Sequence, residues 1–151
     1  MIVRLCAESF DPWRELADYQ AQASEMAGKC GATGVFVGSM RDFNQGDDVR
    51  SMYLEHYPGM TEKQLQLIVA EAQSRWQLLD TLLIHRIGRV LPNDTLVLVA
   101  VWSEHRGDAF DASRFIMENL KSQAPFWKQE TLESGQMRWV EKNSDGYKRQ
   151  Y

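Results

Sequence analysis

The chain has 151 residues and a formal net charge of −4, from 17 Lys and Arg against 21 Asp and Glu. Hydrophobic residues make up 44% and charged residues 25%, which is typical of a globular chain and excludes disordered or collagen-like classes. The acidic balance argues against non-specific nucleic-acid binding, and no apolar run approaches the roughly 20 residues that span a bilayer. We therefore expect one domain over residues 1–151 in the cytoplasm, with no nucleic-acid or membrane partner.

The cysteines and histidines do not form a metal-binding pattern. Cys6 and Cys30 are far apart, and His56, His85 and His105 are scattered along the chain. Buried thiols are the favoured interpretation of the two cysteines, with a disulfide or a catalytic thiol as the alternatives. We expect no metal site and no bound cofactor.

In the first third of the chain, apolar residues with strand and helix periodicity alternate with turn signals. Asp11 followed by Pro12 is a typical helix start. Two of the expected strands are separated by a polar loop with a turn glycine and are expected to form a hairpin. The expected elements are a strand over 2–6, a helix over 12–26, a strand over 32–41 and a strand over 49–57.

A second helix follows the turn at Pro58 and Gly59, with Thr61 as the expected N-cap. Its apolar residues recur at helical spacing, which predicts that one face packs against a sheet. The residues of this stripe are Leu65, Ile68, Val69, Ala72 and Trp76.

The second half of the chain predicts a third helix between strands. Phe110, Met117 and Leu120 are expected to point inward from this helix, which Pro125 ends. The expected elements are strands over 81–87 and 95–102, the helix over 107–123, a hairpin of 126–131 with 137–140, and a mobile tail over 143–151. The resulting fold class is α+β, with three main helices and a mixed, largely antiparallel sheet.

Common nucleotide-binding and serine-nucleophile motifs are missing from the sequence. What remains is a set of cations at strand ends and in the connections after them, where sites tend to be built. If they converge, they make an anion pocket. These cations are Arg41, His105, Arg106, Lys121 and Lys128.

Most of these cations also have a purely structural explanation. Arg41 can be a hairpin-end charge, and His105 and Arg106 can be surface residues before a helix. Lys121 lies in a last helical turn, where the helix dipole favours a cation.

Lys128 is harder to explain by structure alone. It alternates with Phe126 and Glu130 on one strand face, while Trp127 and Gln129 take the other face. A lysine between aromatic residues is expected to be partly desolvated, which lowers the pKa of its ammonium group and brings proton transfer near neutral pH within reach.

Five segments, in their order and spacing, resemble the large, catalytic subunit of molybdopterin synthase, the MoaE-like family. The resemblance runs from about residue 31 to residue 140, and the second and fifth segments are long and unusual. The segments are FVGSMR (36–41), LEHYPGMTE (54–62), IHRIG (84–88), SEHR (103–106) and LKSQAPFWKQE (120–130).

The resemblance implies an α/β hammerhead-type fold and a homodimer. Each protomer would bind one small ubiquitin-like sulfur-carrier subunit with a C-terminal Gly-Gly, which gives a heterotetramer. The implied substrate is cyclic pyranopterin monophosphate, and the implied reaction delivers sulfur from the carrier's thiocarboxylate to form the dithiolene of molybdopterin, for molybdenum cofactor.

The resemblance also assigns roles to residues. Lys121 and Lys128 match the two catalytic lysines. Our own mechanistic hypothesis is that Lys121 orients the thiocarboxylate and acts as general acid/base, and that Lys128 stabilises developing charge and assists opening of the cyclic phosphate. The phosphate would be held by Arg41 together with His105 and Arg106, and this His-Arg pair would reach into the neighbouring protomer's pocket. Further residues match positions that line the substrate site, namely Ser39, Met40, Gln129 and Glu130.

Two other interpretations remain open from the sequence. A non-catalytic module that binds a phosphorylated metabolite or a ubiquitin-like tail would keep the anion-binding residues without needing both lysines. An α+β domain whose cations are only surface charge would leave them scattered after folding.

Overall fold

The computed structural model describes residues 1–141 of the chain, so the tail expected to be mobile (143–151) lies outside the described residues. Within them, the three α-helices are α1 (Pro12–Gln22), α2 (Met60–Arg75) and α3 (Arg106–Gln123). The strands in the same part of the chain are β1 (Ile2–Cys6), β2 (Ala32–Ser39), β3 (Phe43–Asn44), β4 (Asp47–His56), β5 (Leu78–Arg86), β6 (Gly88–Val90), β7 (Thr95–Ser103), β8 (Phe126–Leu132) and β9 (Met137–Trp139). The predicted α+β class is confirmed.

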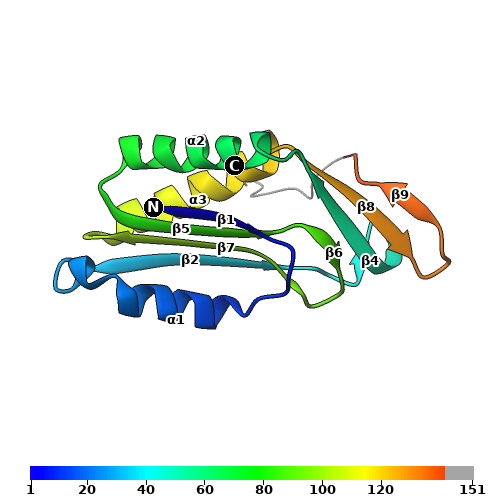
Figure 1. The fold of residues 1–151 in the computed structure, drawn as a ribbon, viewed down its shortest axis with the longest axis horizontal. Coiled ribbons are helices and arrows are strands. Elements are labelled where there is room, and N and C mark those ends of the chain that lie inside the picture. Colours follow the sequence, from blue (N-terminus) through cyan, green and yellow to red (C-terminus); the bar gives the residue numbers. More distant parts are fainter. Residues whose placement is uncertain (142–151) are drawn as a thin grey trace, which may run out of the picture.

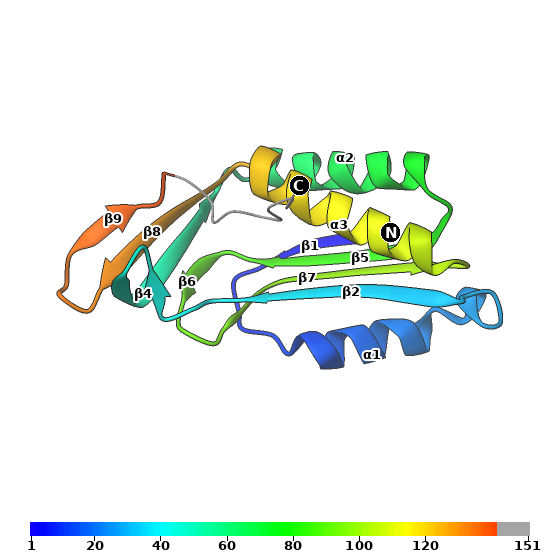
Figure 2. The same cartoon turned by 180° about the vertical axis from the view of Figure 1, so that it is seen from behind.

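Four strands form the main sheet, in the order β1-β5-β7-β2. The β1–β5 pair is parallel and the other two pairs are antiparallel. Helices α2 and α3 cover one face of this sheet and α1 covers the other, as Figures 1 and 2 show from opposite sides. Strand β7 is central and buried on both faces, in agreement with its continuous apolar sequence.

Alternation along the strands divides the interior of the main sheet into two cores. Leu83, Val99 and Val101 point toward α2 and α3, where they pack with the predicted stripe of α2. Leu98 and Trp102 point the other way and pack under α1. Alternate side chains of β5 and β7 point into opposite cores. The packing of both helical layers therefore depends on the register of the same two strands.

The remaining strands form a second sheet at one end of the molecule, in the order β3-β4-β8-β9, with β6 also paired to β4. Figure 1 shows β4, β8 and β9 extending away from the helical layers. A third apolar cluster lies on the inner face of this sheet and contains Met40, Val49, Met52, Leu54, Val90 and Leu132. The strands are therefore divided between two sheets.

The predicted hairpin of β2 with β4 is wrong. Strand β2 pairs with β7 in the main sheet, and β4 pairs with β8 in the second. The intervening segment instead contains β3, which forms a short hairpin with β4 around Gln45 and Gly46, both with positive φ (52° and 83°). Local periodicity predicts a strand but not its partner, because the partner is chosen by burial of the whole face.

Two helix boundaries also differ from the prediction. Asp11 caps α1 as expected, but α1 ends at Gln22 and a separate 3-10 turn covers Ser24–Met26. Gly59, with φ of 83°, is the N-cap of α2 in place of Thr61, and the Glu62 carboxylate accepts its N–H at 2.7 Å.

The buried Thr61 has a different role from the one predicted. Its hydroxyl accepts a hydrogen bond from Tyr57 N (2.9 Å) and donates one to Pro125 O (3.1 Å). Thr61 thereby connects the start of α2 to the link between α3 and β8.

In α3, Met117 and Leu120 are buried as predicted, whereas Phe110 is 69% exposed, contrary to its expected inward position.

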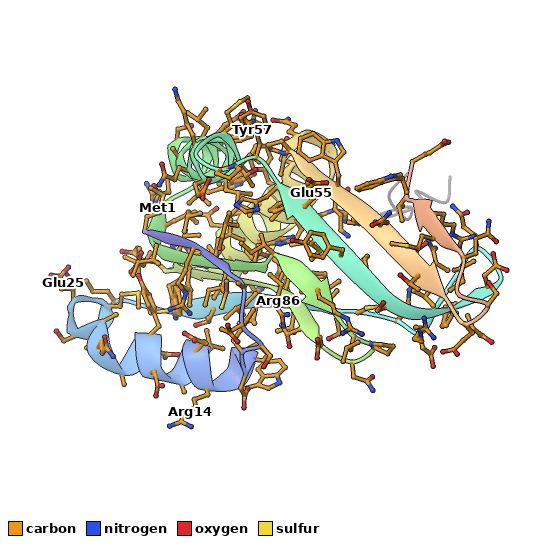
Figure 3. All side chains as sticks on the ribbon, turned by 45° about the vertical axis from the view of Figure 1, so that its right-hand side comes forward. Met1, Arg14, Glu25, Glu55, Tyr57 and Arg86 are labelled. Carbon is orange, nitrogen blue, oxygen red and sulfur yellow. The ribbon has the colours of Figure 1, made fainter. Side chains whose placement is uncertain are left out.

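The junction between the two sheets is stabilised by Arg86, which is only 4% exposed. Figure 3 shows Arg86 where β5 leads into β6. Its Nη2 donates to Arg89 O at 2.7 Å, and Nη1 lies 3.8 Å from the Asp94 carboxylate. Arg86 thus connects the β5–β6 turn to the turn before β7.

Gly34 sets the distance between α3 and β2. A Cβ added there would lie 2.6 Å from the carbonyl oxygen of Ala109, which is helix backbone and cannot rotate away. The glycine therefore allows close packing of α3 on the sheet, and this packing positions the far end of the same helix.

We predict that Gly34→Ala destabilises the protein by about 1–3 kcal/mol, because α3 must move off the sheet. Gly107→Ala is the matched control, since no atom lies within 4 Å of its added Cβ, and replacing a helical glycine is neutral or stabilising. Urea unfolding of both variants measures the difference. Equal stabilities would contradict the role assigned to Gly34.

Candidate functional site

Two adjoining hollows, of about 120 and 350 Å³, lie where the main sheet meets the second sheet. They share four residues, Ser39, Leu96, Lys121 and Lys128. The first is also lined by residues of β3 and β8 and the second by residues of β2 and α3, and because of the shared residues we treat them as one cavity. The further residues used below are Met40, Arg41, Phe43, Asn44 and Glu130 in the first hollow, and His85 and Glu118 in the second.

The two lysines reach this cavity from both sides of one tight connection. Lys121 lies in the last turn of α3, which ends because Pro125 disfavours helical geometry in the residue before it. Strand β8 begins immediately afterwards, and Lys128 is its third residue. The predicted alternation is confirmed: Glu130 is buried on the cavity side, whereas Trp127 is 47% exposed.

The environment of Lys128 favours the loss of its proton. Burial, which is the largest cause, and the neighbouring Lys121 ammonium together lower the pKa of its ammonium group to about 8, while the Glu130 carboxylate acts in the opposite direction. At pH 7 about a tenth of such a group is neutral. Lys128 can therefore both accept and donate a proton near neutral pH, as its sequence context predicts.

Arg41 provides a third cation at the opening of the cavity. Its guanidinium lies over the Phe43 ring, 5.0 Å from the centroid. Met40 beside it is 5% exposed, and its N–H donates to Asp94 O at 2.9 Å, which fixes the chain where it leaves β2. The planar guanidinium is thus held at the rim in a form suited to a phosphate or carboxylate.

Glu130 combines a place in the cavity wall with a bracing role. The carboxylate is 4% exposed and accepts hydrogen bonds from Asn44 Nδ2 and Arg138 Nε, both at 3.1 Å. Arg138 also donates to Asp47 at 2.7 Å. This network connects β3, β4, β8 and β9, and it provides the charge pairing that a buried carboxylate requires.

Not every predicted site residue reaches the cavity within one chain. His105 and Arg106 are exposed at the N-terminal end of α3, about 22 Å along the helix axis from Lys121 at 1.5 Å per residue. Gln129 is on the face of β8 opposite to Lys128. The structure thus brings together Ser39, Met40, Arg41, Lys121, Lys128 and Glu130.

His85 is a cavity residue that the sequence did not single out. It is 6% exposed and stacks on Phe126, with ring centroids 4.1 Å apart and planes at 15°. The pKa of its imidazole is lowered to about 4, mainly by burial and also by the charges of Lys128 and Lys121, while the hydrogen bond with the Arg86 carbonyl acts in the opposite direction. Its position in β5, two residues beyond the buried Leu83 and on the same face, is the pattern that could have identified it.

The described residues also bear on metal and thiol chemistry. Among residues 1–141, no cluster of His, Cys, Asp and Glu has the arrangement needed to hold a metal ion. Cys6 and Cys30 are both free and half-buried. In the same part of the chain, no helix combines the length and the apolar character that crossing a membrane requires.

A family model described as "MoaE protein" matches residues 9–123. The chain belongs to the MoaE family. Curated relatives named molybdopterin synthase catalytic subunit include those of Ralstonia nicotianae (50% identity, 92% of this chain and 76% of the relative) and Pseudomonas aeruginosa (50% identity, 93% and 91%). As a member of this family, the chain is an enzyme subunit that acts in molybdopterin synthesis within molybdenum-cofactor biosynthesis.

Solved MoaE-family structures share this fold. The MoaE protein of Burkholderia ambifaria has a TM-score of 0.75 at 47% identity, over 91% of this chain and 87% of that one. Molybdopterin synthase from Staphylococcus aureus has a TM-score of 0.75 at 32% identity, over 90% and 94%. A Helicobacter pylori complex of subunits 1 and 2 of molybdopterin-converting factor shares the fold at 20% identity, with a TM-score of 0.77 over 95% and 93%.

We predict that Lys128→Met stabilises the protein at pH 7 by roughly 1–3 kcal/mol, because the variant no longer buries an ammonium group. The native pKa of Lys128 is about 8 and its unfolded value is 10.5, so the unfavourable term is full below pH 8 and disappears above pH 10.5. The stability gain should therefore shrink as the pH rises through this window.

Denaturant unfolding at several pH values measures this gain. Lys63→Met, at an exposed position of α2, is the control and should show no such pH-dependent gain. A Lys128→Met variant that is less stable than the parent at pH 7 would contradict the assigned burial of the ammonium group.

Proposed function

We propose that the chain transfers sulfur from the C-terminal thiocarboxylate of a small ubiquitin-like carrier subunit to cyclic pyranopterin monophosphate, and so forms the dithiolene of molybdopterin. The observation that carries this proposal is the pair of neighbouring lysines, one of them with a pKa of about 8, in a cavity with an arginine at its rim. Such a site fits a reaction between two anions that also requires proton transfer.

The cavity charges offset a repulsion that the reaction itself creates. A cyclic phosphate and a thiocarboxylate 4 Å apart repel by about 4 kcal/mol at an effective dielectric constant near 20. Arg41 and the two lysines provide the opposing charge. Lys121 orients the thiocarboxylate and acts as general acid/base, and Lys128 stabilises developing charge while the cyclic phosphate opens.

The sulfur arrives on the carrier, so the subunit needs no sulfur nucleophile of its own. The half-buried Cys6 and Cys30 do not line either hollow of the cavity. Free thiols are typical of reducing compartments, which supports the cytoplasm as the proposed location. An extended Gly-Gly tail entering the cavity would give specificity without a large hydrophobic interface.

We further propose a homodimer that binds two carriers as a heterotetramer. Phe110, 69% exposed near the start of α3, and Phe36, 42% exposed on the edge strand β2, provide an apolar surface for a second copy. In such a dimer, the His105–Arg106 pair of one protomer would supply anion-binding groups to the cavity of the other. This arrangement would explain why the pair lies far from Lys121 of its own chain.

The alternative is a non-catalytic module that binds a phosphorylated metabolite or a ubiquitin-like tail. It would need Arg41 but would have no reason to place two ammonium groups side by side in a partly enclosed cavity, because their repulsion is unfavourable and simple binding does not require it. The remaining interpretation, cations that are only surface charge, does not agree with the clustering of Arg41, Lys121 and Lys128.

We predict that Lys121→Ala and Lys128→Ala each reduce molybdopterin formation by at least about 100-fold, because proton transfer and charge stabilisation are each worth about that much. The assay combines the purified protein with thiocarboxylated carrier and cyclic pyranopterin monophosphate. Lys63→Ala is the control and should retain parental activity. Full activity of both folded lysine variants would overturn the catalytic assignment.

We predict that two inactive variants complement each other when mixed. A Lys121→Ala protomer paired with a His105→Ala/Arg106→Ala protomer contains one intact composite cavity, so random re-pairing of equal amounts should restore about a quarter of the parental sites. Product formation before and after subunit exchange measures this. Activity that stays at the level of the separate variants would exclude a site shared between protomers.

A further inference from the structure

His85 lies in the wall of the cavity next to the lysine pair. It occupies β5, and its ring lines the same hollow as Lys121 and Lys128. The ring stacks on Phe126, which precedes Lys128 by two residues on the same face of β8. This stacking fixes the imidazole plane against the first residue of β8, two positions before Lys128.

The hydrogen bond of His85 defines which ring nitrogen carries the proton. Nδ1 lies 2.7 Å from the backbone oxygen of Arg86, and a carbonyl oxygen can only accept. Nδ1 therefore carries the hydrogen, and Nε2 presents a lone pair. A hydrogen bond at one ring nitrogen sets the function of the other in this way.

Among the groups that face this hollow, His85 is the buried and neutral hydrogen-bond acceptor. Lys128 from β8 and Lys121 from α3 both act on the ring through their charges. Glu118 of α3 also lines the hollow but is exposed, and β1 and β7 place Leu5 and Val97 in register with His85.

We propose that His85 is a positioning residue: its neutral imidazole, held by Arg86 and Phe126, presents Nε2 as the hydrogen-bond acceptor that orients the Lys128 ammonium group. A lysine side chain has four rotatable bonds, so the ammonium group of a catalytic lysine needs a hydrogen-bond partner that fixes its position. A carboxylate in this place would neutralise the lysine pair, whereas a neutral acceptor orients it and leaves its charge for the anions. The inference deepens the proposed sulfur transfer, and its relevance to activity rests on that function.

Three substitutions separate the two nitrogens of the ring. In His85→Asn the amide can replace the Nδ1 donor, in His85→Gln it can place an acceptor where Nε2 was, and His85→Phe keeps the stacking but neither polar group. Thr81→Val is the matched control, because Thr81 is also buried in β5 and its hydroxyl has no hydrogen-bond partner among the described residues.

The primary measurement is the pKa of Lys128 from pH-dependent competitive acetylation, read by mass spectrometry of the Lys121 and Lys128 peptides. Loss of an acceptor from an ammonium group should lower the pKa of Lys128 by about one unit in the Asn and Phe variants. The Gln and Thr81→Val variants should remain within about a third of that shift.

The outcomes decide the proposal even if the Phe variant does not fold. A shift in Asn that Gln does not show supports Nε2 as the acceptor. The proposal is overturned if the pKa of Lys128 is unchanged in both variants or shifts equally in both. A shift in the Gln variant alone also overturns it, because that result assigns His85 to strand anchoring through Nδ1. Thermal unfolding of each variant identifies any that are not native.

A second measurement connects the inference to activity. The pH profile of single-turnover product formation should move with the Lys128 pKa in His85→Asn and remain parental in His85→Gln. The acetylation experiment uses neither carrier nor substrate, so its failure is distinguishable from a failure of the proposed sulfur transfer.

Discussion

The site depends most on two half-buried lysine side chains that lie next to each other. Ammonium groups are strongly hydrated and repel one another, so placing two of them together in a partly enclosed cavity is unfavourable. The fold maintains this arrangement by making both lysines part of one short, rigid connection, in which α3 ends at Gln123 and β8 begins at Phe126. The backbone of each lysine is therefore fixed beside the cavity by a helix end or a strand.

Contacts far from the cavity determine where that connection lies. Gly34 allows α3 to pack closely on β2, and the hydrogen bond from Thr61 to Pro125 ties the connection to the start of α2. On the other side, the Glu130 carboxylate joins Asn44 and Arg138 and holds the strands of the second sheet together. The cavity is therefore a consequence of how two sheets are joined, and its charges are positioned by packing rather than by a flexible loop.

The net charge of −4 describes the surface average and hides a local segregation. Arg41 from the β2–β3 connection, Lys121 from α3 and Lys128 from β8 meet in one cavity, while the carboxylate of Glu130 is hydrogen-bonded to Arg138 and Asn44. The positive potential of the three cations therefore acts on a ligand that enters the cavity. A small protein can in this way attract anions without being basic overall.

Much of the local structure followed from the sequence alone. Periodicity identified the three helices and the central strand β7, and the alternation around Lys128 correctly predicted a desolvated lysine, because these features depend on near neighbours. The partner of β2, the position of Phe110 and the cap of α2 did not follow from it, because they depend on which faces become buried. Alternation could place His85 on the inward face of β5, but its position in the wall of the lysine cavity depends on the tertiary contact of its ring with Phe126 of β8. The separation of His105 and Arg106 from Lys121 was likewise decided by tertiary structure, since the straight helix between them sets a distance that no motif records.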